Sequence, residues 1–142
     1  MTVIYGILNT QTSDLEYSNA GHHLPYLIRR DGSLTILENT GGMALGVLEE
    51  ATFSVKHASW EPGECIFLYT DGITEAMNSA SDFYGEPRLE QILSRHHEQS
   101  PTEIIQATID NLRAYAGDAP QADDITLLAL RYIQPRSSRT DI

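Results

Sequence analysis

The chain has 142 residues, which suits one domain with a substantial core and is too short for two. Hydrophobic residues make up 41% of it and charged residues 20%, ordinary values for a globular protein that argue against wholesale disorder. Nine Lys and Arg residues against 20 Asp and Glu residues give a formal net charge of -11, which argues against binding to nucleic acid.

Short β-strands separated by turns are predicted for the first two-thirds of the chain. The expected strands cover residues 3–8, 15–18, 25–30, 34–37, 53–60 and the apolar run 66–69. Asp31-Gly32, between the third and fourth of these, is a strong hairpin signal. The run at 66–69 lies between Gly63 and Gly72 and consists of strand-forming apolar residues, which predicts a buried strand.

Two helices and a last strand are predicted next. The first helix covers about 86–96, with Leu89, Ile92 and Leu93 on one side. The second begins at Ser100-Pro101-Thr102-Glu103, which supplies an N-cap, a proline at the first helical position and a glutamate at the third, and it ends at Gly117. The segment 123–132 is a second strand rich in apolar residues, and 133–142 is expected to be a frayed polar tail.

Aspartates stand at the ends of the two most apolar strands. Asp71 follows the run at 66–69, whereas Asp123 and Asp124 open the last strand. If the two strands are antiparallel neighbours, these ends meet and the carboxylates converge. Converging carboxylates repel one another unless a cation binds, and oxygen ligands favour Mg²⁺, Mn²⁺ or Ca²⁺. The alternative is that each aspartate only caps its own turn.

Two other motifs have mainly structural interpretations. His22 and His23 are adjacent in an extended segment, where neighbouring side chains point to opposite faces and rarely chelate one ion together. We expect one of them to pack beneath the loop and the other to be exposed. The glycines of "TGGMALG" predict a tight loop with close backbone approach, because no Lys-Ser/Thr pair follows as in a phosphate-binding loop.

The sequence indicates a cytoplasmic protein. No apolar stretch approaches the roughly 20 residues of a membrane span, and the N-terminus lacks the basic region and long apolar segment of a secretory signal. The single cysteine, Cys65, has no partner for an internal disulfide, which suits a reducing compartment. We therefore expect neither a membrane nor a nucleic acid among the partners of the protein.

Segments along nearly the whole chain resemble the SpoIIE/RsbU-type phosphatases, the bacterial branch of the protein phosphatase 2C-like, metal-dependent serine/threonine phosphatases. In chain order they are "YSNAGHHLPYLI", "TGGMALGV", "EPGECIFLYTDGITEA", "FYGEPRL" and "QADDITLLAL". The resemblance implies an α+β fold, an α-β-β-α sandwich of two antiparallel sheets flanked by helices. It also implies a pair of divalent metals at one edge of the sandwich.

The resemblance assigns the acidic residues to that metal site. Asp71 in "TDG" and Asp123 in "DDIT" match metal ligands, and they would act in catalysis through a metal-activated water. Gly72 and Asp124 complete the implied metal-binding set, with Asp124 supporting the site from behind the ligands. Two Mn²⁺ or Mg²⁺ ions about 3.5–4 Å apart can polarise a phosphoryl group and activate a water. They would also cancel the repulsion between this acidic protein and a phosphoserine.

A further loop and a substrate class follow from the same resemblance. Asn19, Gly21 and His22 match a family loop near the site, and its implied role is structural. The implied substrate is a phosphorylated anti-anti-sigma-type protein, so the implied role is sigma factor regulation and signal transduction.

The chain also departs from the family pattern. Family members carry an earlier motif resembling Gly-Asp-Tyr/Phe-Tyr-Asp, whose aspartate bridges the two metals, and no such motif occurs in this sequence. We therefore expect residues 1–132 to be the C-terminal part of the domain, catalytically incomplete alone and with at most one well-formed metal site. The truncated sheet should leave an apolar face or open edge that drives self-association, most simply as a symmetric dimer.

The sequence is also compatible with two other functions. One is a non-catalytic, phosphatase-like module that binds a partner through its acidic face or sheet edge. The other is a structural domain held by Ca²⁺ or Mg²⁺, for which loss of the ion would lower stability without affecting any activity. The upstream aspartate motif discriminates, because only a protein that carries it can complete the catalytic site.

Overall fold

A computed structural model describes residues 1–134, which fold into seven strands and two helices. The strands are β1 (Val3–Asn9), β2 (Asp14–Ala20), β3 (Tyr26–Ile28), β4 (Leu34–Ile36), β5 (Lys56–Ser59), β6 (Cys65–Tyr69) and β7 (Leu127–Arg131). The helices are α1 (Gly85–Arg95) and α2 (Pro101–Ala116). Most of the polar tail expected at 133–142 lies outside the described residues.

The strands form two antiparallel sheets. The first sheet has the strand order β1-β2-β5 and the second has the order β4-β3-β6-β7. The predicted hairpin at Asp31-Gly32 joins β3 to β4. Gly32 adopts a φ of 85° there, a conformation that favours glycine. The Asp31 side chain accepts a hydrogen bond from the N–H of Ser33 at 2.9 Å, which closes the turn.

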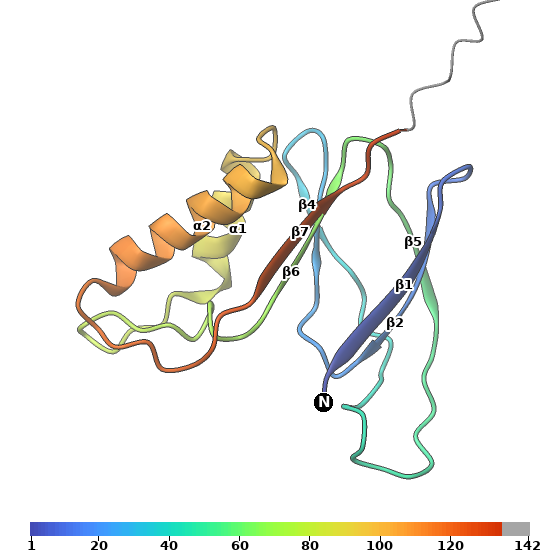
Figure 1. Ribbon diagram of the computed structural model, residues 1–142, viewed down its shortest axis with the longest axis horizontal. Coiled ribbons are helices and arrows are strands. Elements are labelled where there is room, and N and C mark those ends of the chain that lie inside the picture. Colours follow the sequence, from blue (N-terminus) through green and yellow to red (C-terminus); the bar gives the residue numbers. More distant parts are fainter. Residues whose placement is uncertain (135–142) are drawn as a thin grey trace, which may run out of the picture.

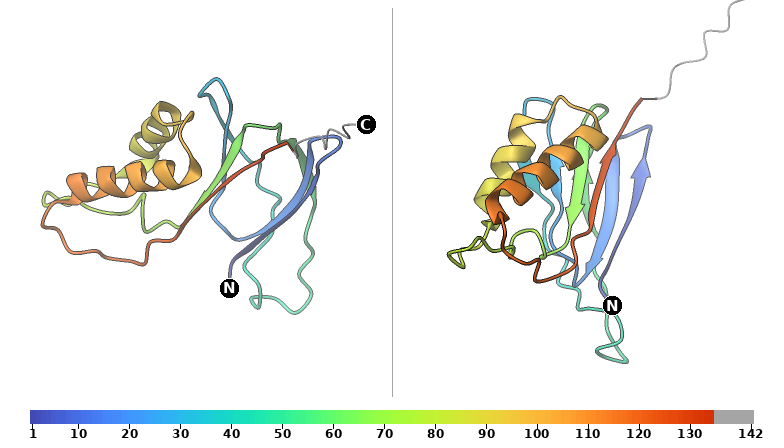
Figure 2. Two further views of the ribbon diagram at one scale, coloured as in Figure 1. Left: turned by 45° about the horizontal axis from the view of Figure 1, so that its top comes forward. Right: turned by 60° about the vertical axis from the view of Figure 1, so that its left-hand side comes forward.

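The helices, the second sheet and the first sheet lie in successive layers (Figure 1). Helices α1 and α2 cover one face of the second sheet, and the other face of that sheet lies against the first sheet (Figure 2). Among residues 1–134, no helix covers the outer face of the first sheet. This arrangement confirms the predicted α+β sandwich of antiparallel sheets as a partial one, with helices on one side.

Strand β6 is apolar throughout because it lies between two cores. Phe67 faces the helices and belongs to a core with Leu89 of α1 and Ile104 of α2. Ile66 faces the opposite way and belongs to the core between the sheets, together with Leu15 of β2. Successive side chains of a strand point to opposite faces, so a strand covered on both sides has no position for a charged residue.

Helix α2 begins at the predicted capping box. The N–H of Ser100 donates to the Glu103 carboxylate at 2.8 Å, and the N–H of Glu103 donates to Ser100 Oγ at 3.3 Å. Pro101 occupies the first helical position, and Gly117 ends the helix with a φ of 56°. These reciprocal bonds satisfy two N–H groups that the helix leaves without partners, which explains the sharp start of α2.

The two longest predicted strands are only half as long in the structure. Of the segment 53–60, only Lys56–Ser59 pairs with β2, and the hydroxyl of Ser18 instead donates to the carbonyl oxygen of Ser54 at 2.8 Å. Of the segment 123–132, only Leu127–Arg131 is strand. Its first residues form a loop that lies against the turn after β6. In both cases a side-chain contact replaces the regular ladder at one end.

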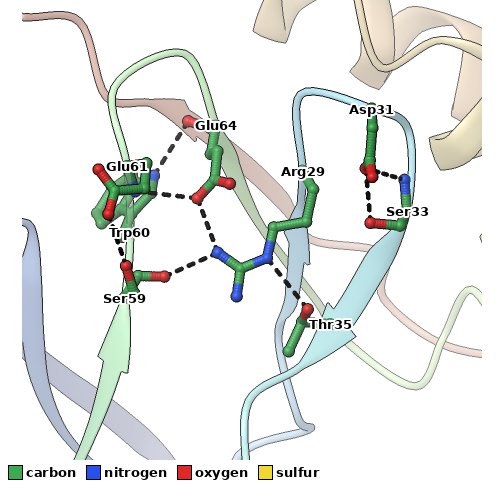
Figure 3. Close-up of polar contacts among 8 residues, drawn as sticks. All are labelled: Arg29, Asp31, Ser33, Thr35, Ser59, Trp60, Glu61 and Glu64. Atoms are coloured by element: carbon green, nitrogen blue, oxygen red, sulfur yellow. Dashed lines mark hydrogen bonds and ion pairs between the residues drawn. The ribbon is translucent and has the colours of Figure 1, made fainter.

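A largely buried ion pair ties the two sheets together (Figure 3). Arg29, just after β3, donates through Nη1 to Glu64 Oε2 and to the carbonyl oxygen of Ser59 on β5, each at 2.8 Å. The Glu64 side chain is 8% exposed and that of Arg29 is 24% exposed. Glu64 Oε2 also accepts from the N–H of Glu61 at 2.9 Å, and its carbonyl oxygen accepts from the indole N–H of Trp60 at 3.0 Å. The pair therefore links β3, β5 and the start of β6.

Candidate functional site

Strands β6 and β7 remain in contact beyond their ends, where the aspartates lie. The N–H of Thr70 donates to the carbonyl oxygen of Thr126 at 3.1 Å, and the N–H of Thr126 donates to Thr70 Oγ1 at 3.0 Å. The Thr70 hydroxyl also donates to the carbonyl oxygen of Asp124 at 3.2 Å. These bonds hold the turn that contains Asp71 beside the Asp123-Asp124 segment.

Sequence reasoning missed Thr70 and Thr126 as the residues that join the two segments. A signal was present, since one threonine directly precedes Asp71 and the other closes the "DDIT" motif. A hydroxyl can donate and accept at once, and Thr70 uses both capacities across the gap between the strand ends.

Gly72 allows the two segments to approach closely. It is buried, and a Cβ placed on it would collide with the carbonyl oxygen of Asp124 and lie 3.4 Å from the Ile125 side chain. A larger residue would therefore push the Asp71 turn away from the segment that carries Asp123. This accounts for the glycine in "TDG" without requiring it to bind a ligand.

The carboxylate of Asp71 is exposed and has no partner among residues 1–134. The turn itself is closed by backbone, because the carbonyl oxygen of Asp71 accepts from the N–H of Glu75 at 2.9 Å and from the Thr74 hydroxyl at 3.3 Å. Turn capping by the side chain, the alternative for Asp71, is thus not what the structure shows. The carboxylate remains available to an ion or a ligand.

Asp123 differs from Asp71 in this respect. Its Oδ1 accepts from the N–H of Asp124 at 2.7 Å, and its carbonyl oxygen accepts from the side-chain amide of Gln121 at 2.8 Å. For Asp123, the alternative of turn capping therefore applies to one of the two carboxylate oxygens. The Asp124 carboxylate has no hydrogen-bond partner in the part of the chain that the structure describes, and both aspartates are exposed.

The described residues fit only part of an ion site. Within residues 1–134, no group of three or more His, Cys, Asp and Glu side chains is arranged to hold a metal ion. Asp71 and Asp123 bring carboxylates to one end of the β6–β7 pair, whereas Mg²⁺ and similar ions surround themselves with about six oxygen ligands. Water or residues outside this segment would have to supply the others.

Asn19 fixes the loop that was predicted to support the site. It is 2% exposed and pairs reciprocally with His22, donating through Nδ2 to the His22 carbonyl oxygen at 2.9 Å and accepting from the His22 N–H at 2.8 Å. Its own N–H donates to Thr40 Oγ1 at 2.9 Å. Gly42 passes so close that a Cβ would collide with the Asn19 carbonyl oxygen, and Gly21 has a φ of 72°. The predicted close backbone approach at "TGGMALG" is confirmed.

The expectation that one of the two adjacent histidines is exposed is wrong. His22 Nδ1 lies 2.8 Å from the carbonyl oxygen of His23, and the His23 ring contacts Tyr69 edge-on with a centroid distance of 4.7 Å. Both are half-buried because the loop folds back onto the end of β6. They line a cavity of about 400 Å³ together with Tyr26 and Glu86. The loop thus contacts β6 two residues before the aspartate turn.

Tyr69 makes the stability of the fold sensitive to alkaline pH. Burial raises the pKa of its phenol to about 12, above the ordinary tyrosine value, and burial also raises the pKa of Tyr26 and Tyr84. The folded chain thus favours the neutral phenol. Its contribution to stability is fully present below about pH 10, the ordinary tyrosine pKa, and is lost as the pH rises toward the folded-state value.

We therefore expect unfolding, followed by circular dichroism, to begin above about pH 10. A Tyr69→Phe protein should lose less stability over this range than the wild type, because one raised pKa has been removed. Tyr5→Phe is the matched control, since Tyr5 is 65% exposed. Equal alkaline sensitivity of the wild-type and Tyr69→Phe proteins would contradict the assignment to Tyr69.

The two helices do not meet the requirements of a membrane span. Neither α1 nor α2, the helices of the described part of the chain, is long and apolar enough to cross a bilayer.

Comparison with known proteins identifies the relatives of this chain. The family described as Stage II sporulation protein E (SpoIIE) matches residues 1–133. Protein IcfG of Synechocystis is 31% identical over 91% of this chain and 20% of its own length. The phosphoserine phosphatase RsbU of Bacillus subtilis is 28% identical over 92% of this chain and 38% of its own length. The chain thus spans well under half of either relative.

Solved structures show the same fold. The SiaA-PP2C domain of Pseudomonas aeruginosa superposes with a TM-score of 0.71 at 26% identity, over 84% of this chain and 46% of that one. The phosphatase domain of SpoIIE from Bacillus subtilis, presoaked with manganese, superposes with a TM-score of 0.68 at 14% identity, over 93% of this chain and 56% of that one. In both, this chain corresponds to about half of the comparison domain.

Proposed function

The chain belongs to the SpoIIE family, and from that premise we propose that it is part of a cytoplasmic, metal-dependent phosphatase acting on phosphoserine or phosphothreonine in a bacterial regulatory protein. Its relatives include a phosphoserine phosphatase and a PP2C domain. By analogy with them, an anti-anti-sigma-type phosphoprotein is the proposed substrate, and sigma factor regulation the proposed role.

The observation that carries this proposal is the meeting of two acidic segments at the β6–β7 end. Asp71 has an exposed carboxylate without a partner in residues 1–134, and the Thr70 bonds hold it beside the segment of Asp123 and Asp124. In the proposed assignment Asp71 and Asp123 are metal ligands, while Asp124 and the loop of Asn19 and His22 support them. Bound Mn²⁺ or Mg²⁺ would supply Lewis-acid activation of the phosphoryl group.

Two carboxylates at the edge of a partial sandwich do not make a complete site, so the remaining ligands must come from elsewhere. We assign them to an upstream segment with the metal-bridging aspartate motif. The 142-residue chain alone should then hold at most one ion, weakly. It should also release little phosphate, because the bridging charge is absent.

Phosphate release with and without Mn²⁺ tests the proposal. The substrates are p-nitrophenyl phosphate and a phosphoserine peptide. The proteins are the 142-residue chain and a longer protein in which an upstream segment with the aspartate motif precedes it. Metal-dependent release by the longer protein is expected. Its absence would contradict the phosphatase assignment and favour a non-catalytic binding module. Robust release by the shorter chain would show that other carboxylates make the site.

The open sheets support a second proposal, self-association of the isolated chain. Strand β1 and strand β7 each have a neighbour on one side only among the described strands. Tyr5 and Ile7 of β1 are 65% and 53% exposed, and Leu128 and Leu130 of β7 are 48% and 46% exposed. Unpaired edges that carry large apolar side chains are prone to pair with another chain.

We expect the wild-type chain to sediment as a dimer at high concentration. Ile7→Lys should shift it to monomer, because a charged residue on β1 would be desolvated by a second sheet edge. Val47→Lys is the matched control, since Val47 is 57% exposed in a loop. A wild-type chain that remains monomeric would contradict the proposal, as would a dimer that Ile7→Lys leaves intact.

A further inference from the structure

A cavity beside the aspartates borders the proposed metal site. It measures about 390 Å³ and lies between the end of α2, the segment 72–77 and the loop 117–125. Its volume falls within the roughly 300–1,000 Å³ of typical small-ligand sites. Most of its lining is apolar, including Leu112 and Ala116 of α2, and Met77 and Phe83 at its edge are 37% and 55% exposed.

The cavity is continuous with the candidate metal-binding edge. Gly72 and Asp123 both line it, so one end of the cavity borders the turn where a phosphoryl group would be bound. A substrate held with its phosphoserine at that edge would therefore place neighbouring residues over the apolar lining. The position of the cavity favours an extension of the substrate over an unrelated ligand.

Two charged side chains give the cavity both a donor and an acceptor. Arg113 and Glu75 line it, both are exposed, and neither side chain has a hydrogen-bond or ion-pair partner within residues 1–134. A guanidinium only donates hydrogen bonds and a carboxylate only accepts them. An extended peptide offers the complementary carbonyl and N–H groups along its backbone. A small anion would instead meet the carboxylates of Glu75 and Asp123.

We propose that this cavity binds the peptide segment next to the phosphoserine and takes up a large apolar side chain of that segment. Arg113 donates to its backbone carbonyl groups, and Glu75 accepts from its N–H groups. The proposal rests on the proposed function for the position of the phosphoserine. It adds a substrate class, a phosphoprotein with a large apolar residue flanking the modified serine.

Binding of fluorescent peptides to the 142-residue chain tests this specificity. Two leucine peptides carry leucine either directly before or directly after the phosphoserine. A serine peptide carries serine at both of these positions, and each peptide is made with and without phosphate. One of the two leucine peptides should bind about tenfold more tightly than the serine peptide, because burying a leucine side chain is worth at least that factor. Arg113→Gln should weaken leucine and serine peptides alike, since it contacts backbone.

Substitutions on α2 locate the effect. Ala116→Trp fills the cavity and should abolish the preference for leucine, whereas Ala114→Trp adds the same side chain at an exposed position that does not line the cavity. Ala119→Trp fills the cavity from the loop and replaces Ala116→Trp if that variant melts below the wild type. Equal dissociation constants for leucine and serine peptides would overturn the proposal. A preference that survives both cavity-filling variants would also overturn it.

The design separates this inference from the function on which it rests. If the aspartates do not bind a metal ion, neither phosphate nor Mn²⁺ will change peptide affinity, yet the leucine preference and its loss in Ala116→Trp will remain. If the metal site exists but the cavity does not bind the peptide, phosphate will strengthen binding in Mn²⁺ without any preference for leucine.

Discussion

Replacing Asp71 by alanine is expected to abolish metal-dependent phosphate release by the longer protein that carries the upstream aspartate motif. The exposed Asp71 carboxylate has no partner in residues 1–134, so its removal should leave the fold intact and remove a proposed metal ligand. Loss of one group that stabilises transition-state charge lowers kcat by about 100-fold or more, and loss of a metal adds to this. Asp123→Ala should behave in the same way.

Asp124→Ala should have a milder effect, about 10- to 100-fold in metal affinity, if Asp124 supports the metal ligands without binding the metal itself. Asp118→Asn is the control for the change in net charge, because Asp118 is exposed in the loop that precedes Asp123 and Asp124. Phosphate release as a function of Mn²⁺ concentration distinguishes the variants. Full activity of the Asp71→Ala protein would remove Asp71 from the set of ligands.

Replacing Arg29 by methionine is expected to lower the stability of the fold strongly. It would leave the Glu64 carboxylate, 8% exposed, without its cation. Loss of one partner from a buried pair costs about 3–5 kcal/mol, and the 24% exposure of Arg29 places the expected loss near the lower end. Since domains of this size are stable by about 5–15 kcal/mol, a loss of this size should be plain in urea unfolding.

The double variant Arg29→Met/Glu64→Leu should recover part of the loss, because no unpaired charge then remains buried. Glu38→Gln is the matched control in an exposed pair, where Lys56 and Glu38 side chains are 40% and 76% exposed. It should change the free energy of unfolding by less than about 1 kcal/mol. If Arg29→Met proves no worse than Glu38→Gln, the pair does not hold the two sheets together.

Local patterns in the sequence predicted most of the elements because neighbouring residues determine them. The capping box needs only two residues three positions apart, Ser100 and Glu103. The unbroken apolar run of β6 likewise indicates that both of its faces are buried. The position of Asp71 beside the Asp123 segment was also predictable, since apolar strands with aspartates at matching ends are natural antiparallel partners.

Other features depend on contacts between segments far apart in the sequence. The pair of Arg29 and Glu64 joins residues 35 positions apart, and no local pattern marks them as partners. The ring of His23 contacts the ring of Tyr69, which lies far away in the sequence, and no local pattern marks the two as neighbours. The helical pattern of α2 gives no sign of a cavity at Arg113, because the loop 117–125 and the segment 72–77 supply the other walls.

Titration of the 142-residue chain with Mn²⁺, followed by electron paramagnetic resonance, tests the central claim most directly, because it requires neither the upstream segment nor a substrate. The wild-type chain and Asp118→Asn should bind one ion weakly and with equal affinity. Asp71→Asn and Asp123→Asn, which carry the same change in charge as that control, should each lose this binding. If both bind Mn²⁺ as tightly as the wild type, the acidic end of the β6–β7 pair is not a metal site.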